Sequence, residues 1–170
     1  KITLVEIGVT NGGSLMMWRE YFKEANIIGI DFNPSAKKWE EYGFKIFIGD
    51  QSDPKFWTDF FSKVGKIDIL IDDGGHTNQQ QISTFHSCYE NINENGIILF
   101  EDTHSSYLKE FGNPSKYSFS SKFISIEPHI ITLSLSLSNS SSPSTSCTLP
   151  EYIASVTRPV FVKSSRVTVA

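Results

Sequence analysis

The sequence has few cysteines, no long apolar stretch and little positive charge. Its two cysteines, Cys88 and Cys147, lack the spacing of a metal site and cannot form a disulfide framework, which fits a reducing compartment. No apolar run is long enough to span a bilayer, and no basic segment followed by an apolar one indicates a signal peptide. With 15 Lys and Arg against 19 Asp and Glu, the net charge of -4 argues against nucleic acid or a membrane as partner. We therefore expect a cytoplasmic protein that binds a small molecule.

A length of 170 residues with 39% hydrophobic residues is enough for one folded domain with its own core. The charge is unevenly distributed: residues 1–123 carry 12 Lys and Arg and 17 Asp and Glu, whereas residues 124–170 carry 3 and 2. We therefore predict a core domain over 1–123 and a separate Ser-rich segment over 124–170. The chain begins at Lys1, directly before an apolar run, so we expect further residues to precede it in the natural protein. The sequence leaves the oligomeric state open, a homo-oligomer included.

The first 123 residues alternate between two kinds of segment. Five short apolar runs predict strands buried on both faces: 2–8, 26–31, 44–50, 67–73 and 96–102. Four segments with helical spacing lie between them: 14–24, 34–42, 53–64 and 77–91, with Ser14 expected to cap the first. This alternation predicts an α/β fold, a Rossmann-like doubly wound and mostly parallel sheet.

The segment beyond residue 123 is less regular. Residues 124–138 alternate apolar residues with Ser, and residues 158–170 contain a second apolar run. These patterns allow an antiparallel pair of strands that closes the sheet, joined through a Ser-rich linker.

A glycine-rich turn, VEIGVTNGGSL, follows the first strand and contains Glu6, Gly8, Gly12 and Gly13. Glycines let the backbone approach a ligand, and the following helix offers free N–H groups, so a nucleotide-type cofactor is expected here. A turn without a ligand is the alternative. The spacing differs from GxGxxG, and Glu6 would repel a pyrophosphate but suit a cofactor that carries an amino group.

Two further polar positions follow the second and third strands. Asp31 ends the second strand, where a carboxylate accepts hydrogen bonds from a ribose, although it could instead cap the helix after Pro34. Asp50 and Gln51 end the third strand, where they could reach an adenine edge or simply form a turn.

The strongest signal is a pair of acidic strand ends, IDDGGH and FEDTH. They bring Asp72, Asp73, Glu101 and Asp102 to one edge of the sheet, where open α/β folds bind ligands. Crowded carboxylates repel one another unless a cation intervenes, and Mg2+ is the ion we expect. His76 follows on a Gly-Gly loop and could take a proton from a bound substrate. The alternative is that the acids cap helices and the histidines are solvated.

Five ordered motifs carry a resemblance to a known family: VEIGVTNGGSLMMWREYF, IIGIDFNP, GDQSDPKFW, IDILIDDGGH and GIILFEDTHSSY. Residues 3–112 resemble the class I S-adenosylmethionine-dependent methyltransferases that methylate hydroxyls of macrolide sugars, the mycinamicin type, and related cephalosporin-hydroxylase-like proteins. Gly75 stands where that family usually has Ser.

The resemblance implies a role for each matching residue. Those implied to surround the methionine part of S-adenosylmethionine are Glu6, Gly8, Gly12 and Ser14, with Asp72 beside its amino group. Asp31 would bind the ribose, and Asp50 and Gln51 would lie near adenine. The implied Mg2+ ligands are Asp73, Glu101 and Asp102. His76 would be the general base, and His104 and Tyr107 would line the substrate side.

These expectations together predict a Mg2+-assisted O-methyltransferase that acts on a hydroxyl of a sugar or natural-product-like molecule. Two rival functions remain. An NAD-dependent oxidoreductase would use the same fold and Asp31, but it gives no reason for Glu6 or the acid cluster. A non-catalytic cofactor-binding module would bind S-adenosylmethionine without turnover.

Overall fold

The structure, a computed structural model, describes residues 1–111, 130–134 and 159–163. Its strands are β1 (Thr3–Ile7), β2 (Asn26–Asp31), β3 (Lys45–Ile48), β4 (Ile67–Asp72), β5 (Ile92–Phe100), β6 (Ile130–Ser134) and β7 (Pro159–Lys163). Its α-helices are α1 (Gly13–Tyr21), α2 (Pro54–Val64) and α3 (Asn78–Cys88). The 3-10 helices are η1 (Pro34–Tyr42), η2 (Tyr89–Asn91), η3 (Thr103–Tyr107) and η4 (Lys109–Phe111).

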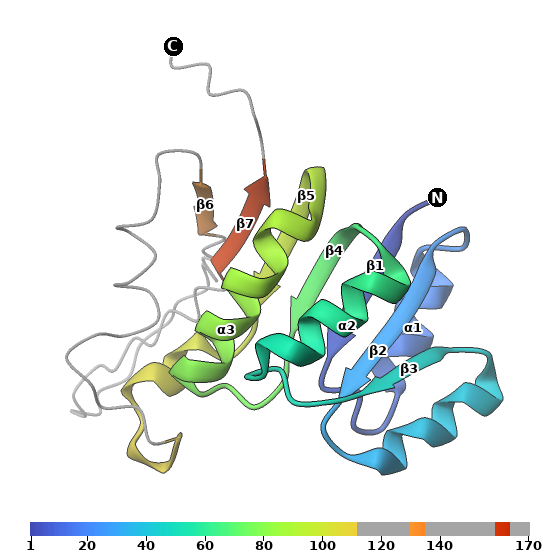
Figure 1. Ribbon diagram of the computed structural model, residues 1–170, viewed down its shortest axis with the longest axis horizontal. Coiled ribbons are helices and arrows are strands. Elements are labelled where there is room, and N and C mark those ends of the chain that lie inside the picture. Colours follow the sequence, from blue (N-terminus) through green and yellow to red (C-terminus); the bar gives the residue numbers. More distant parts are fainter. Residues whose placement is uncertain (112–129, 135–158, 164–170) are drawn as a thin grey trace, which may run out of the picture.

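One sheet contains all of these strands in the order β3-β2-β1-β4-β5-β7-β6 (Figure 1). The first five strands pair in parallel, which confirms the predicted doubly wound sheet. Strand β7 pairs antiparallel with both β5 and β6. Residues 112–129, 135–158 and 164–170 lie outside the described residues. They include Cys147 and the predicted domain boundary at residue 123.

Apolar residues of the central strands pack on both faces of the sheet. Helices α2 and α3 cover one face (Figure 1). On that face Trp57, Phe60 and Phe85 lie buried against β1, β2, β4 and β5. Helix α1 and η1 cover the other face through Leu15 and Ala36. Burial of each large side chain contributes roughly 1.5–3 kcal/mol, so this core stabilises the packing of the helices against the sheet.

Local sequence explains most helix starts. Asp53 accepts a hydrogen bond from the Lys55 N–H and caps α2, and Thr77 forms a capping box with Gln80 at the start of α3. The expected cap at Ser14 is wrong, because Gly12 in a left-handed conformation precedes α1 and the Ser14 hydroxyl is used elsewhere. Every helix in the described part of the chain is too short or too polar to span a bilayer.

Candidate functional site

Four predicted site residues lie level with one another at the carboxyl edge of the sheet. Ile7 of β1 pairs with Ile30 of β2 and with Asp72 of β4, and Asp72 pairs with Phe100 of β5. The next residue along each strand follows at the same height: Asp31, Gly8, Asp73 and Glu101. The strand order reverses between β1 and β4, which is where open α/β sheets bind ligands.

Glu6 lies beneath the glycine-rich turn. It is buried, and its carboxylate accepts a hydrogen bond from the Ser14 hydroxyl at 2.8 Å. Burial raises the pKa of Glu6, the Ser14 bond opposes this shift, and the charges of Asp73 and Glu101 reinforce it. A cation bound beside these three carboxylates would relieve their repulsion.

Asp31 and Asp50 both hold local backbone with their carboxylates. The Asp31 oxygens accept from the N–H groups of Thr10 and Asn33, at 3.1 and 2.8 Å. Asn33, rather than Asp31, caps η1, so the alternative capping role of Asp31 is wrong. A carboxylate has about four acceptor positions, so Asp31 can still accept from a ribose. Asp50 accepts from the N–H and hydroxyl of Ser52, which is the turn that the sequence allowed as its alternative.

Gln51 and Asp72 lie inside the protein and not on the surface where a cofactor would contact them. Their exposed fractions are 4% and 0%. The Gln51 amide donates to both Asp72 carboxylate oxygens, at 2.9 Å each, and accepts from the Gly75 N–H. Burial raises the pKa of Asp72, and the bonds from Gln51 and Gly74 oppose this shift. The structure thus differs from the expected contacts with adenine and with the cofactor's amino group, because these polar atoms bind one another.

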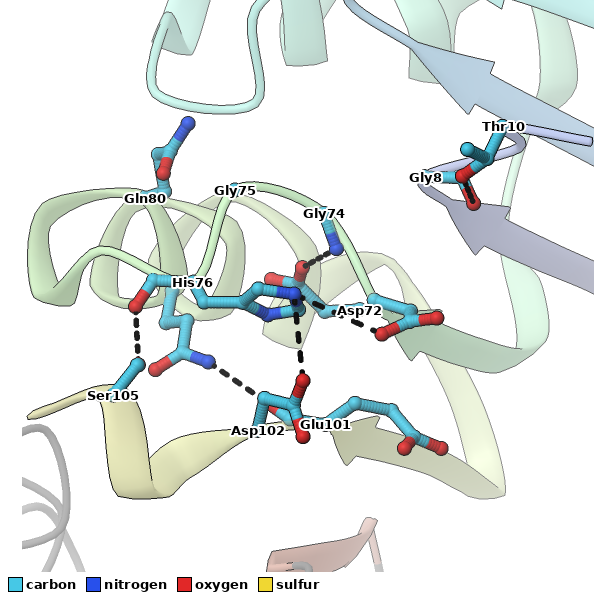
Figure 2. Close-up of polar contacts among 12 residues, drawn as sticks. Gly8, Thr10, Asp72, Gly74, Gly75, His76, Gln80, Glu101, Asp102 and Ser105 are labelled. Atoms are coloured by element: carbon cyan, nitrogen blue, oxygen red, sulfur yellow. Dashed lines mark hydrogen bonds and ion pairs between the residues drawn. The ribbon is translucent and has the colours of Figure 1, made fainter. Parts of the chain in front are cut away.

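Asp73, His76 and Asp102 converge at the same edge, each offering a ligand atom within 4.8 Å of the others. The His76 Nε2 lies 3.9 Å from Asp73 Oδ1 and 3.8 Å from Asp102 Oδ2. Figure 2 shows the His76 ring facing the Asp102 carboxylate. The carboxylate side chains are 48% and 51% exposed and the imidazole is 16% exposed, so solvent reaches the space between them.

The remaining predicted residues lie around this group. Glu101 is not one of the three converging residues, and its side chain points away from the His76 ring in Figure 2. His104 is half-exposed, with Nδ1 3.8 Å from Asp102 Oδ1. The backbone of Tyr107 ends η3, and its side chain lies outside the described part of the chain.

The group fits a hard divalent cation. Exposed carboxylates at strand ends are the oxygen ligands that Mg2+ prefers, and imidazole is a poorer ligand for it. Asp73 and Asp102 therefore suit the ion, whereas His76 remains suited to accept a proton at Nε2.

The backbone carries a further mark of a functional site. Thr10, His76 and Asp102 have φ angles of 43°, 57° and 48°, in the left-handed region that non-glycine residues rarely adopt. Such conformations cost of order 1–3 kcal/mol each and gather where function requires them. All three residues follow the ends of β1, β4 or β5.

Several residues that hold this site carried no recognised signal in the sequence. The Ser105 hydroxyl donates to the His76 carbonyl at 2.5 Å, a contact drawn in Figure 2. The Gln81 amide donates to the Glu101 carbonyl at 3.1 Å. A Cβ at Gly75 would lie 2.3 Å from the Gln80 amide, so glycine leaves room for the capping box here. The period of two along β4 was a usable signal, because it puts Asp72 on the same face as the buried Leu70.

Comparisons with known proteins agree with this architecture. A family model described as a methyltransferase domain matches residues 5–103, more than half of the chain. The chain belongs to this methyltransferase family. The resemblance found in the sequence is thereby confirmed.

Three relatives of this methyltransferase domain are informative. The 8-demethyl-8-alpha-L-rhamnosyl tetracenomycin-C 2'-O-methyltransferase of Streptomyces olivaceus is 34% identical over 117 residues, covering 65% of this chain and 31% of that protein. The mycinamicin VI 2''-O-methyltransferase of Micromonospora griseorubida is 30% identical over 119 residues, covering 66% and 30%. The structure of the MycE methyltransferase from the mycinamycin biosynthetic pathway, in complex with Mg and SAH, is 30% identical over 68% of this chain and 33% of that chain, with a TM-score of 0.62. The present chain therefore spans about a third of the length of these relatives.

Proposed function

We propose that this chain contains the catalytic core of a Mg2+-assisted, S-adenosylmethionine-dependent O-methyltransferase. The convergence of Asp73, His76 and Asp102 beside the glycine-rich turn carries the proposal, because it puts two cation ligands next to a candidate base. The family match and the relatives named as sugar O-methyltransferases support the same reaction class.

S-adenosylmethionine would bind across the carboxyl ends of β1 and β2 and supply the methyl group. Gly8 and Gly12 let the turn approach the methionine part, and Ser14 acts indirectly by holding Glu6. The carboxylate of Glu6 contributes negative charge toward the cofactor's amino group. Asp31 would accept hydrogen bonds from the ribose, and Asp50 borders the expected adenine position. Gln51 and Asp72 would act from below this surface.

Bound Mg2+ supplies Lewis-acid polarisation of the acceptor hydroxyl. Asp73 and Asp102 would hold the ion, with Glu101 as a further ligand after a change of its side-chain rotamer. His76 Nε2 would accept the hydroxyl proton as the methyl group is transferred, and the nearby carboxylates would stabilise the imidazolium that forms. Most of the acceleration would come from alignment of the acceptor oxygen, methyl group and sulfur.

The acceptor would be a sugar hydroxyl or a similar hydroxyl of a natural product. His104 is half-exposed beside Asp102 and would border the acceptor, together with Tyr107. The partner is thus a small molecule, neither nucleic acid nor a membrane, and we expect the reaction to take place in the cytoplasm.

Calorimetric titration with S-adenosylhomocysteine, S-adenosylmethionine and NAD, each with and without Mg2+, tests the proposal. We expect micromolar binding of the first two and none of NAD. Binding of NAD alone would favour an oxidoreductase instead. Hydroxylated sugars are then screened as acceptors for a radiolabelled methyl group, and cofactor binding without transfer to any of them would favour a binding module.

A further inference from the structure

The Gln51 side chain connects the turn after β3 with the loop that carries His76. Its Nε2 donates to both oxygens of Asp72, and its Oε1 accepts from the Gly75 N–H at 2.9 Å. We propose that Gln51 and Asp72 form a buried positioning pair that fixes the Gly74-Gly75 loop, and with it His76 and Asp73. This inference deepens the proposed function, on which the roles of His76 and Asp73 rest.

Both backbone N–H groups of the Gly74-Gly75 loop donate hydrogen bonds to this pair. The Gly74 N–H donates to Asp72 Oδ1 at 3.2 Å, as Figure 2 shows, and the Gly75 N–H donates to Gln51. A Cβ at Gly74 would lie only 2.1 Å from Gln51 Oε1, so the loop lies directly against the amide. Two successive glycines have much conformational freedom, and these hydrogen bonds remove it at the residues just before His76.

The pair is itself anchored in the core. The backbone carbonyl of Gln51 accepts a hydrogen bond from the Trp57 indole N–H at 2.8 Å. The side-chain Nε2 of Gln51 also donates to the Thr84 hydroxyl at 3.1 Å. Trp57 and Thr84 are buried in α2 and α3, so both helices hold the amide in place. Gln51 thereby connects the loop to the buried faces of α2 and α3.

The hydrogen bonds to Asp72 come from neutral groups: the amides of Gln51 and Gly74 and the hydroxyl of Thr84. A buried carboxylate that loses such donors becomes unsatisfied, which favours rearrangement of its surroundings. Loss of the Gln51 amide would therefore release the loop and displace Asp73, the residue next to Asp72. Changes at residues that orient metal ligands typically lower metal affinity about 10–100-fold.

An exchange of the two functional groups gives a specific test. In the double variant Gln51→Glu/Asp72→Asn, the carboxylate at position 51 can still accept from the Gly75 N–H and from the amide at position 72. The oxygen of that amide can accept from the Gly74 N–H. Both bonds from the glycine loop and one bond between positions 51 and 72 are thus retained while the charge changes position, and the Thr84 hydroxyl can donate to the new carboxylate instead of accepting from the amide. Gln51→Glu alone, by contrast, puts two carboxylates against each other.

Three quantities are measured on the whole chain: Mg2+ affinity and S-adenosylhomocysteine affinity by calorimetry, and hydrogen exchange of the Gly75 amide by NMR. We expect Gln51→Glu to weaken Mg2+ binding about 10–100-fold and to speed Gly75 exchange, and the double variant to restore both. Gln79→Glu is the matched control, since it adds the same charge at an exposed position of α3 and should change neither quantity.

Several outcomes would overturn the positioning pair. One is Gln51→Glu with wild-type Mg2+ affinity and Gly75 exchange; another is a double variant that folds but stays as impaired as Gln51→Glu.

If Asp72 instead contacts the cofactor's amino group, the single variant Asp72→Asn weakens S-adenosylhomocysteine binding, and the double variant does not recover that binding. If Gln51→Glu does not fold, the double variant still decides. A wild-type chain that binds neither Mg2+ nor S-adenosylhomocysteine contradicts the proposed function, whereas Gly75 exchange still tests the pair.

Discussion

Substitution of Gly8 by Ala tests how the glycine-rich turn and the acidic edge depend on each other. Gly8 has a φ of +92°, and an added Cβ would lie 2.1 Å from the carbonyl oxygen of Asp73. This atom belongs to the backbone, so rotation of a side chain cannot relieve the clash. Asp73 is also held by its own N–H, which donates to the Ile7 carbonyl at 3.1 Å. Relief of the clash therefore requires movement of the strand end that carries a proposed Mg2+ ligand.

Two terms set the expected size of the effect. A left-handed conformation costs an L-residue roughly 1–2 kcal/mol, and overpacking a close-packed site costs typically about 1–3 kcal/mol. We therefore expect Gly8→Ala to lower the free energy of unfolding by roughly 2–5 kcal/mol. Gly13→Ala is the matched control, because a Cβ there meets no atom within 4 Å and lies in α1. It should leave stability unchanged or raise it by up to about 1 kcal/mol.

Urea unfolding followed by tryptophan fluorescence measures both variants, and Mg2+ titration of the folded proteins adds the link to the site. We expect Gly8→Ala to bind Mg2+ more weakly and Gly13→Ala to bind it normally. A Gly8→Ala chain within about 1 kcal/mol of wild type, with unchanged Mg2+ affinity, would refute the reasoning, because the two costs together amount to at least about 2 kcal/mol.

Three further substitutions test the proposed chemistry. His76→Ala should slow methyl transfer about 10^2–10^4-fold and leave S-adenosylhomocysteine affinity nearly unchanged in calorimetry, with the exposed His86→Ala as control; equal turnover would exclude His76 as the base. Asp102→Asn should weaken Mg2+ binding about 10-fold or more, whereas Asp59→Asn on the surface of α2 should not, and retained activity in excess chelator would refute the metal site. Burial raises the pKa of Glu6, so the stability linked to its protonation is present at low pH and lost as pH rises through its folded-state pKa. Glu6→Gln should therefore gain stability relative to wild type as pH rises above the ordinary glutamate pKa of about 4.3, measured by urea unfolding; a stability difference that does not change with pH would contradict the assignment.

The sequence predicted the sheet well because continuous apolar runs can be buried only between two layers of helices. Strand β2 was predicted with both ends correct. Strand β5 begins at Ile92, earlier than predicted, because it includes a shift in register against β4 that interrupts the apolar pattern. Helix η1 is a 3-10 helix rather than an α-helix, a difference that apolar spacing over nine residues does not resolve.

The site was predicted in outline, since strand ends bring acids together in any parallel sheet. The individual contacts depend on which way each side chain turns. Asp72 and Asp73 are neighbours in the sequence, yet one is fully buried and the other exposed. Gln51 was expected near adenine because it follows the third strand, whereas its amide turns inward to pair with Asp72. Ser14 was expected as a helix cap, but its hydroxyl donates a hydrogen bond to the nearby Glu6 carboxylate.

The left-handed residues at the edge of the sheet affect how this domain would respond to laboratory evolution. Glycine at position 10, 76 or 102 would relax the backbone, and a screen for heat resistance alone would therefore enrich it there. Thr10 is the most strained of the three, because a β-branched side chain tolerates this conformation less well than His or Asp. Enrichment at position 10 would preserve the proposed chemistry, whereas enrichment at positions 76 and 102 would produce robust but inactive proteins. A thermostability campaign on this domain should consequently select for methyl transfer in every round.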